Sequence, residues 1–195
     1  CFDEVSSLRV GAQNFYPTYN GSFTGEVGFE QLEEFSVDTL LIGHSERRHI
    51  LGETQSFIAK KYAYAKEKKS EIIYCVGEPQ EIREQGIDAV MRYIWEQFED
   101  IDMNYEQLIV AYEPVWAIGT GLSASLADIE EVLARLAQKL RAPLLYGGSV
   151  KVDNLESILH VKHCQGVLVG TASWNEEAFC KMIEIADSVT KGCVR

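Results

Sequence analysis

The sequence predicts an α/β fold built around a parallel sheet, and three features indicate it. Short apolar runs recur at intervals of about 30 residues, the length of a strand–helix repeat. The runs are continuously apolar, as in strands that are buried on both faces of a parallel sheet. A segment with the helical spacing of apolar residues follows each run. The six runs are Leu8–Gln13, Thr39–Gly43, Glu71–Val76, Leu108–Tyr112, Leu144–Tyr146 and Gly166–Val169.

The segments between the runs differ in the strength of their helical signal. After the fourth run, Ser125 and Asp128 have the spacing of a capping box at the start of an apolar stripe. The stripe consists of Leu126, Ile129, Leu133, Leu136 and Leu140. Weaker helices are expected at Phe29–Phe35, Asn154–His160 and Glu176–Ser188. No linker interrupts the alternation, so we expect one domain over residues 1–195, and periodicity alone does not choose between a barrel and a doubly wound sheet.

Composition and charge narrow the class of partner. The chain is 46% hydrophobic and 25% charged, as in ordinary globular proteins, and no apolar run reaches the roughly 18 residues of a membrane span. Its net charge of −12 argues against nucleic acid or an anionic membrane as partner. Five cysteines without a CxxC pair favour free thiols in a reducing, cytoplasmic compartment. The cluster His160, His163 and Cys164 lacks a fourth ligand at useful spacing, so no metal is expected.

A group of polar residues follows the second run, Gly43-His44-Ser45-Glu46-Arg47-Arg48. Function in parallel α/β folds collects just beyond the carboxyl ends of the strands. His44 in that position can donate to a carbonyl substrate or exchange protons with it. Glu46 and Arg47 are expected to form an ion-pair layer beneath the site. A lone histidine is often a satisfied surface or core residue, but the charged cluster directly after a buried strand favours a site.

A carboxylate, Glu113, follows the fourth run directly. Pro114 stiffens one end of the segment that comes next, and Gly119 and Gly121 permit hinge dihedrals at the other end. Closure of such a loop would exclude water and raise the basicity of the carboxylate. The alternative is that Glu113 merely pairs with a nearby arginine.

Small residues follow the last two runs, in Gly147-Gly148-Ser149 and in Gly170-Thr171. Such residues let backbone N–H groups approach an anion closely, and barrels place a phosphate site after their last two strands. Each segment alone is a weak signal, because glycine-rich turns are usually only turns.

Together these motifs closely resemble those of the triosephosphate isomerase family, in the family's order and over nearly the whole chain. The matching segments are Gly11–Asn14, Phe23–Glu26, Gly43–Arg48, Tyr74–Glu78, Tyr112–Gly121, Tyr146–Ser149 and Leu168–Gly170. The resemblance implies an incomplete TIM-type (βα) barrel, with six βα units that correspond to family strands three to eight.

The resemblance also implies roles for single residues. Glu113 would be the base and His44 the neutral electrophile, roles for which this family is itself the standard case. Glu46 would be a third catalytic residue. The phosphate would be bound by backbone groups of Gly119, Ser149, Gly170 and Thr171, and the loop would include Pro114, Trp116 and Thr120. The implied reaction of glycolysis and gluconeogenesis interconverts dihydroxyacetone phosphate and glyceraldehyde 3-phosphate, with no cofactor.

The chain departs from the family pattern at its start. The family begins with a strand that carries an Asn-x-Lys motif, whereas the first run here matches the third family strand. A typical barrel has about 250 residues, so two βα units are expected to be missing. Without that lysine we expect weak or absent isomerase activity for this chain alone. Thr171 replaces a family glycine, and its side chain is expected to crowd the phosphate.

Three functions therefore stay open at this stage. The first is a triosephosphate isomerase, the second is a non-catalytic oligomeric remnant that still binds phosphate, and the third is a different sugar-phosphate enzyme on a modified barrel. In each case the expected ligand is a triose phosphate or a phosphate-like anion. A homodimer or higher oligomer is expected to form through the loop Gln13–Gly28 and through open sheet edges, because unpaired edges invite association.

Overall fold

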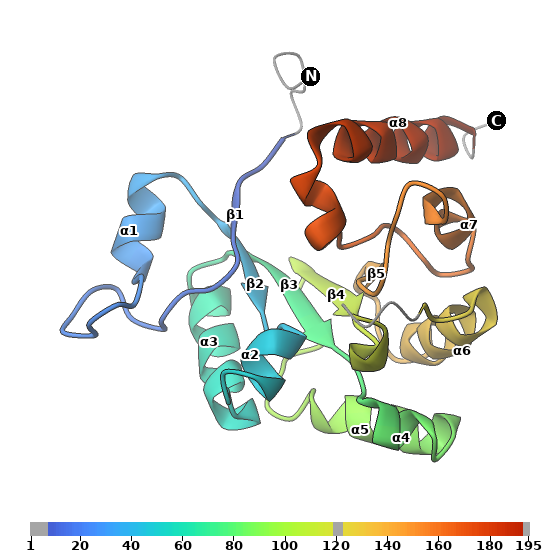
Figure 1. Cartoon of the computed structure of the whole chain (residues 1–195). Helices are drawn as coiled ribbons and strands as arrows, with labels where there is room; N and C mark the ends of the chain where they lie inside the picture. The colour runs from blue at the N-terminus through green and yellow to red at the C-terminus, as the bar shows by residue number, and fades with distance from the viewer. Residues whose placement is uncertain (1–7, 119–122, 193–195) are drawn as a thin grey trace.

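The computed structural model describes residues 8–118 and 123–192. Five parallel strands form one sheet in the order β1-β2-β3-β4-β5, and helices follow the strands along the chain (Figure 1). The predicted α/β class is therefore confirmed. The strands are β1 Gly11–Ala12, β2 Thr39–Ile42, β3 Glu71–Val76, β4 Leu108–Tyr112 and β5 Leu144–Tyr146. The helices are α1 Phe29–Glu34, α2 Ser45–His49, α3 Gln55–Glu67, α4 Gln80–Arg83, α5 Ile87–Glu96, α6 Leu126–Ala137, α7 Leu155–Leu159 and α8 Glu176–Gly192.

The sixth apolar run does not form a strand of its own. Within Gly166–Val169, one isolated parallel bridge joins Val167 to Tyr146 of β5. The Tyr146 N–H donates to the Gly166 carbonyl at 3.0 Å, and the Leu168 N–H donates to the Tyr146 carbonyl at 2.9 Å. The run therefore lies alongside β5 in the expected direction, but its ladder is too short to be a sixth strand. The first run is also shorter than expected, since only Gly11–Ala12 pairs with β2.

The buried apolar residues of α3, α5 and α6 form one core with those of the sheet, whereas α8 packs on α7. Strand residues Leu40, Ile72 and Val110 are fully buried, as are Ile94 of α5 and Leu133 of α6. The predicted capping box at the start of α6 is present, because Ser125 Oγ accepts from the Asp128 N–H at 3.1 Å.

One member of the predicted α6 stripe is not in the core. The side chain of Leu126 is 45% exposed, whereas the other four members are buried. Leu126 is the first residue of α6, and helix ends tend to face solvent because their unpaired backbone groups need partners there. Within the part of the chain that the structure describes, no helix is long and apolar enough to cross a membrane.

Candidate active site

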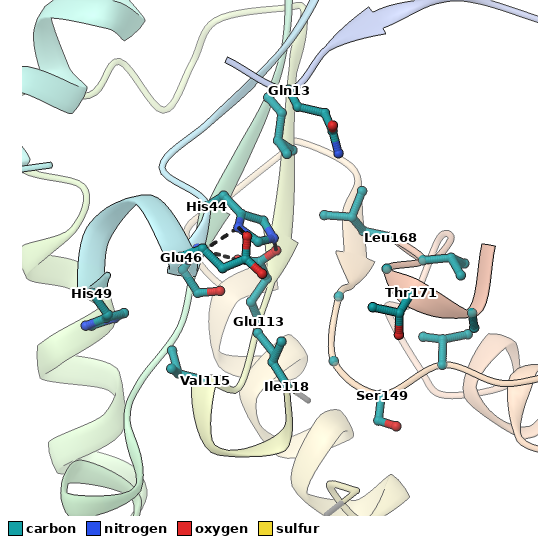
Figure 2. A pocket seen from close by; sticks show the side chains of 18 of the residues that line it. Gln13, His44, Glu46, His49, Glu113, Val115, Ile118, Ser149, Leu168 and Thr171 are labelled. Atoms are coloured by element: carbon teal, nitrogen blue, oxygen red, sulfur yellow. Dashed lines mark hydrogen bonds and ion pairs between the residues drawn. The ribbon is translucent and has the colours of Figure 1, made fainter. Parts of the chain in front are cut away.

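A cavity of about 650 Å³ lies at the carboxyl ends of the strands. Its walls come from the segments that follow β1, β2, β4 and β5 and from the segment after the Val167 bridge (Figure 2). Six of the residues predicted for a site line it, namely His44, Glu46, Glu113, Ser149, Gly170 and Thr171. The topology thus brings together groups that lie more than 100 residues apart in the chain.

Glu113 is the most deeply placed titratable group of the cavity. The residue is 1% exposed, and its Oε2 accepts a hydrogen bond from the Ser45 N–H at 3.1 Å. Its Oε1 lies 3.3 Å from Nε2 of His44 and accepts no well-aligned hydrogen bond within the described residues. Burial raises the pKa of Glu113, opposed by the charge of His44, the Ser45 N–H and the Cys75 thiol. A carboxylate with a raised pKa and a free lone pair is suited to act as a base near neutral pH.

His44 is held by the first turn of the helix that it caps. It is the N-cap residue of α2, and its Nδ1 accepts from the Glu46 N–H at 3.3 Å. Since Nδ1 acts as the acceptor, a neutral ring carries its proton on Nε2, the atom that faces Glu113. The ring can therefore donate this proton to a substrate oxygen that lies in the cavity beside Glu113.

The turn that presents His44 requires a glycine. Gly43 has a φ of +80°, and a Cβ atom there would lie 2.7 Å from Nη2 of Arg48 and 3.0 Å from the Cys75 carbonyl oxygen. Arg48 Nε donates to the Gly43 carbonyl at 2.7 Å, and its Nη2 donates to the Tyr74 hydroxyl at 3.0 Å. The sequence carries no indication of a role for Arg48, yet the hydrogen bonds of its guanidinium group fix the position of the Gly43 turn.

The prediction that Glu46 and Arg47 form an ion-pair layer is wrong. Arg47 Nε instead donates to Glu53 Oε1 at 2.7 Å, whereas the Glu46 side chain is 65% exposed, with its Oε2 3.9 Å from His44 Nδ1. The reason is helical geometry, because consecutive residues of a helix point in different directions. Lys61 is the second cation that pairs with the buried side chain of Glu53. It contacts Glu53 and donates to Asn14 Oδ1 at 2.6 Å, which ties the segment after β1 to α3.

The segment that follows Glu113 is anchored on β3. Pro114 is buried and precedes a 3₁₀ turn at Val115–Ala117. Trp116 Nε1 donates to Glu78 Oε1 at 2.9 Å, and the Tyr112 hydroxyl donates to the same atom at 3.1 Å. Burial raises the pKa of Glu78. The predicted loop residues Gly119 and Thr120 lie outside the described residues.

Two further glycines allow neighbouring segments to approach Glu113. A Cβ atom on Gly77, after β3, would lie 1.7 Å from the Glu113 carbonyl oxygen. A Cβ atom on Gly147, after β5, would lie 2.9 Å from Glu113 Cγ. Any side chain at these positions would push Glu113 out of place. Their position directly after two apolar runs was the only sequence signal for this role.

The opposite wall of the cavity is built from the segments after β5 and after the Val167 bridge. Asn154 Nδ2 donates to the Ser149 carbonyl at 3.0 Å, and its Oδ1 accepts from the Lys151 N–H at 2.8 Å. These bonds fix the loop that carries Ser149. Among the described residues that line the cavity, Lys151 is the only lysine or arginine.

Comparison with known proteins shows the family of the chain. The family model described as triosephosphate isomerase matches residues 1–186. The chain belongs to the triosephosphate isomerase family. It is 57% identical to the triosephosphate isomerase of Sulfurimonas denitrificans over 186 residues, which covers 95% of this chain and 78% of that protein. The corresponding protein of Nitratiruptor sp. is 54% identical over 91% of this chain and 76% of its own length. That of Campylobacter hominis is 49% identical over 93% and 78%.

The described part of the cavity is acidic. The chain spans about three quarters of the length of these relatives. The described residues that line the cavity include two carboxylates, Glu46 and Glu113, but only one lysine or arginine, Lys151. Carboxylates therefore outnumber cations in the part of the cavity that the structure describes.

Proposed function

We propose that this chain carries the active centre of a triosephosphate isomerase. The reaction interconverts dihydroxyacetone phosphate and glyceraldehyde 3-phosphate by proton transfer through an enediol. One observation carries the proposal, namely that the buried Glu113 Oε1 lies 3.3 Å from His44 Nε2 inside a cavity of about 650 Å³. A base and a proton donor at that separation can act on adjacent carbon and oxygen atoms of one small substrate.

The proposed steps use only these two side chains. Glu113 removes a proton from the hydroxymethyl carbon beside the ketone, while the Nε2–H of His44 donates to the carbonyl oxygen. His44, now without its Nε2 proton, takes up the proton of the other enediol hydroxyl, the one on the carbon that Glu113 deprotonated. Protonated Glu113 then delivers a proton to the neighbouring carbon, which leaves the aldehyde. Each group ends in its starting state, so no cofactor or metal is needed.

We propose that the phosphate lies against the opposite wall. Backbone groups of Ser149, Gly170 and Thr171 border the cavity there, and Lys151 is the nearby cation. A Cβ atom on Gly170 would meet nothing within 4 Å, so this segment leaves open space. Glu46 is the proposed third catalytic residue, next to His44. The roles of Gly119 and Thr120 stay predictions.

The finer architecture is also a proposal. We propose a single domain over residues 1–195 that corresponds to six units of a TIM-type barrel, family strands three to eight. The strand order supports this because it follows the chain without the reversal that marks a doubly wound sheet, and the Val167 bridge continues it.

The proposed assembly is a dimer or higher oligomer in the cytoplasm. In the loop Gln13–Gly28, the side chains of Tyr19, Phe23 and Val27 are 43–45% exposed. The rings of Tyr16 and Phe23 lie 4.3 Å apart, which gives this loop an ordered aromatic face. Such a face, together with the open edge of β1, supports association through these elements.

The alternative function is a non-catalytic remnant that binds phosphate. The excess of carboxylates over cations in the described part of the cavity favours it, since a dianion gains little from such a field. The same excess supports the expectation that this chain alone turns over weakly.

A coupled assay of triose phosphate interconversion tests the two functions. It compares the wild-type chain with Glu113→Gln and with Glu106→Gln, an exposed glutamate that serves as the matched control. Loss of a general base lowers kcat by about 10²–10⁴-fold, so turnover that only Glu113→Gln removes supports the isomerase. Absence of turnover, with inorganic phosphate binding in a calorimetric titration, supports the remnant. Absence of both contradicts both functions.

A further inference from the structure

The side-chain amide of Gln97 makes two hydrogen bonds to the backbone of one residue, Gly77, and so clamps the two peptide groups on either side of its α-carbon. Gln97 follows the last residue of α5 and is 7% exposed. Its Nε2 donates to the Gly77 carbonyl at 2.8 Å, and its Oε1 accepts from the Gly77 N–H at 3.1 Å. Both backbone groups of this buried glycine are thus satisfied by one amide, a demanding arrangement because buried amide groups need partners.

The backbone of Gly77 packs directly against the backbone of Glu113. The Gly77 α-carbon faces the Glu113 backbone so closely that an added Cβ atom would lie 1.7 Å from the Glu113 carbonyl oxygen. The two segments are joined on either side of this contact, since the Glu113 N–H donates to the Val76 carbonyl at 2.8 Å and the Val115 N–H donates to the Glu78 carbonyl at 3.0 Å. A shift of the Gly77 peptide therefore shifts Glu113.

The backbone of Gln97 reaches toward the other half of the site. The Tyr74 hydroxyl donates to the Gln97 carbonyl oxygen. Arg48 Nη2 donates to that same hydroxyl at 3.0 Å, and Arg48 Nε donates to the Gly43 carbonyl at 2.7 Å. One chain of buried and partly buried hydrogen bonds thus leads from Gln97 to the residue that precedes His44.

We propose that Gln97 is a positioning residue of the active centre, and that its amide sets the depth and orientation of the Glu113 carboxylate through Gly77. The inference rests on the proposed function for its kinetic consequence. Gln97 lies outside the cavity lining and touches no reacting atom. A helix-end glutamine between Trp95 and Phe98 carries no sequence signal of this role.

Loss of the amide has a defined physical consequence. The Gly77 N–H and C=O become unpaired in a buried setting and must rotate toward water or another partner. The Glu113 backbone follows, the carboxylate becomes better hydrated, and its pKa falls toward the ordinary value, because burial is the main cause that raises it. The other groups that face this carboxylate are His44, Ser45, Cys75 and, through its charge, Arg48.

The test replaces Gln97 by Met, which keeps the length of the side chain and removes the amide. The matched control is Gln165→Met, because Gln165 Oε1 also accepts a backbone N–H, that of Leu144 at 2.9 Å, at the start of β5. The full chain is used. The readouts are the melting temperature, kcat and KM across pH, and the titration midpoint of the Glu113 side-chain carboxyl by ¹³C NMR, assigned with Glu113→Gln.

The expected result separates the two variants. Gln97→Met lowers kcat by about 10-fold or more with little change in KM, since a displacement of about 1 Å at a reacting group costs up to about 10²-fold. It also moves the Glu113 midpoint to lower pH. Gln165→Met lowers the melting temperature but leaves kcat and the midpoint at the wild-type values. A Gln97→Met protein with wild-type kcat and midpoint, and only a lower melting temperature, overturns the proposal.

Two further measurements cover a chain without turnover and a variant that does not fold. If the chain shows no turnover, the proposed function fails, but the Glu113 midpoint still decides whether Gln97 positions this carboxylate. If Gln97→Met does not fold, Gln97→Asn replaces it, because asparagine adds no charge and keeps an amide, but its side chain is one methylene too short to reach both Gly77 groups. The Glu113 midpoint of that variant is expected to lie below the wild-type value, and an unchanged midpoint contradicts the proposal.

Discussion

Nε2 of His44 lies 3.3 Å from Oε1 of Glu113, and that oxygen accepts no well-aligned hydrogen bond within the described residues. The pair joins the turn after β2 to the end of β4, so the sheet itself sets the separation. Because Glu46 occupies Nδ1 through its backbone N–H, the histidine presents its proton and the glutamate presents a lone pair. This geometry suits the proton donor and the base of the proposed reaction.

The His44→Gln variant tests the role of this proton donor. Glutamine retains an N–H group but does not exchange protons between two oxygen atoms, so kcat is expected to fall by about 10²-fold or more. His49→Gln is the matched control, since His49 is the last residue of α2 and also lines the cavity but is not among the groups that act on the Glu113 carboxylate. Steady-state kinetics of both variants check the prediction. Equal losses in the two would assign the effect to α2 as a whole.

The raised pKa of Glu113 predicts how stability depends on pH. Because the folded state binds the proton more tightly than the unfolded state, Glu113 stabilises the fold most below its unfolded pKa. The contribution is lost as the pH rises through the folded pKa, and the loss is about 1.4 kcal/mol for each pH unit that separates the folded pKa from the unfolded pKa. The Glu113→Gln variant lacks this dependence. Urea unfolding at several pH values is therefore expected to show that the variant gains stability relative to the wild type between acidic and neutral pH.

A constant difference in stability would contradict this prediction. If the free energies of unfolding of wild type and Glu113→Gln differ by the same amount at every pH, the carboxyl titrates alike in the folded and unfolded states. Burial of Glu113 would then have no electrostatic consequence, and its role as a poised base would lose its physical basis.

The central strands were predictable from sequence because both of their edges are paired. β3, β4 and β5 begin and end at the predicted residues, and each has a hydrogen-bonded neighbour on both sides, counting the Val167 bridge beside β5. The first and last runs have one neighbour each in the described sheet, and their paired lengths fell furthest short, whereas β2 ends only one residue before the predicted Gly43. An apolar pattern reports burial, but strand length depends on partners that the pattern does not contain.

The site was predictable where a residue lies within a few positions of the end of an apolar run. His44, Glu113 and Ser149 stand there, and all three line the cavity. Gln97 and Arg48 support the site from helices, and their roles depend on tertiary contacts 20 or more residues away in sequence. The error at Glu46 and Arg47 has the same origin, because adjacent charges suggested a pair that helical geometry separates.

The glycine that precedes His44 can be tested against a second glycine of the same conformation. Gly43 and Gly52 both have positive φ values, +80° and +72°. An added Cβ meets Arg48 and the Cys75 carbonyl at Gly43 but meets nothing within 4 Å at Gly52. Both alanine variants are expected to lose about 1–3 kcal/mol of stability from backbone strain.

Only Gly43→Ala is expected to lose activity as well, because only there does the new methyl group displace the guanidinium that holds the turn. Chemical denaturation measures the shared loss of stability, and kcat measures the difference between the variants. If Gly52→Ala loses as much activity as Gly43→Ala, general strain rather than the Arg48 contact would explain the result.

Lys151 offers a test of how the acidic cavity holds an anion. Hydrogen bonds to charged groups contribute about 1.5–3 kcal/mol, and Lys151 is exposed, so the Lys151→Met variant is expected to raise KM by about 10-fold at low ionic strength. The effect should shrink at high salt, since the Debye length falls from about 10 Å at 0.1 M to about 3 Å at 1 M. Lys181→Met is the control, because Lys181 is exposed on α8 and lies outside this cavity. KM measured for both variants at two salt concentrations checks the prediction, and identical salt dependence in the two variants would remove Lys151 from the phosphate site.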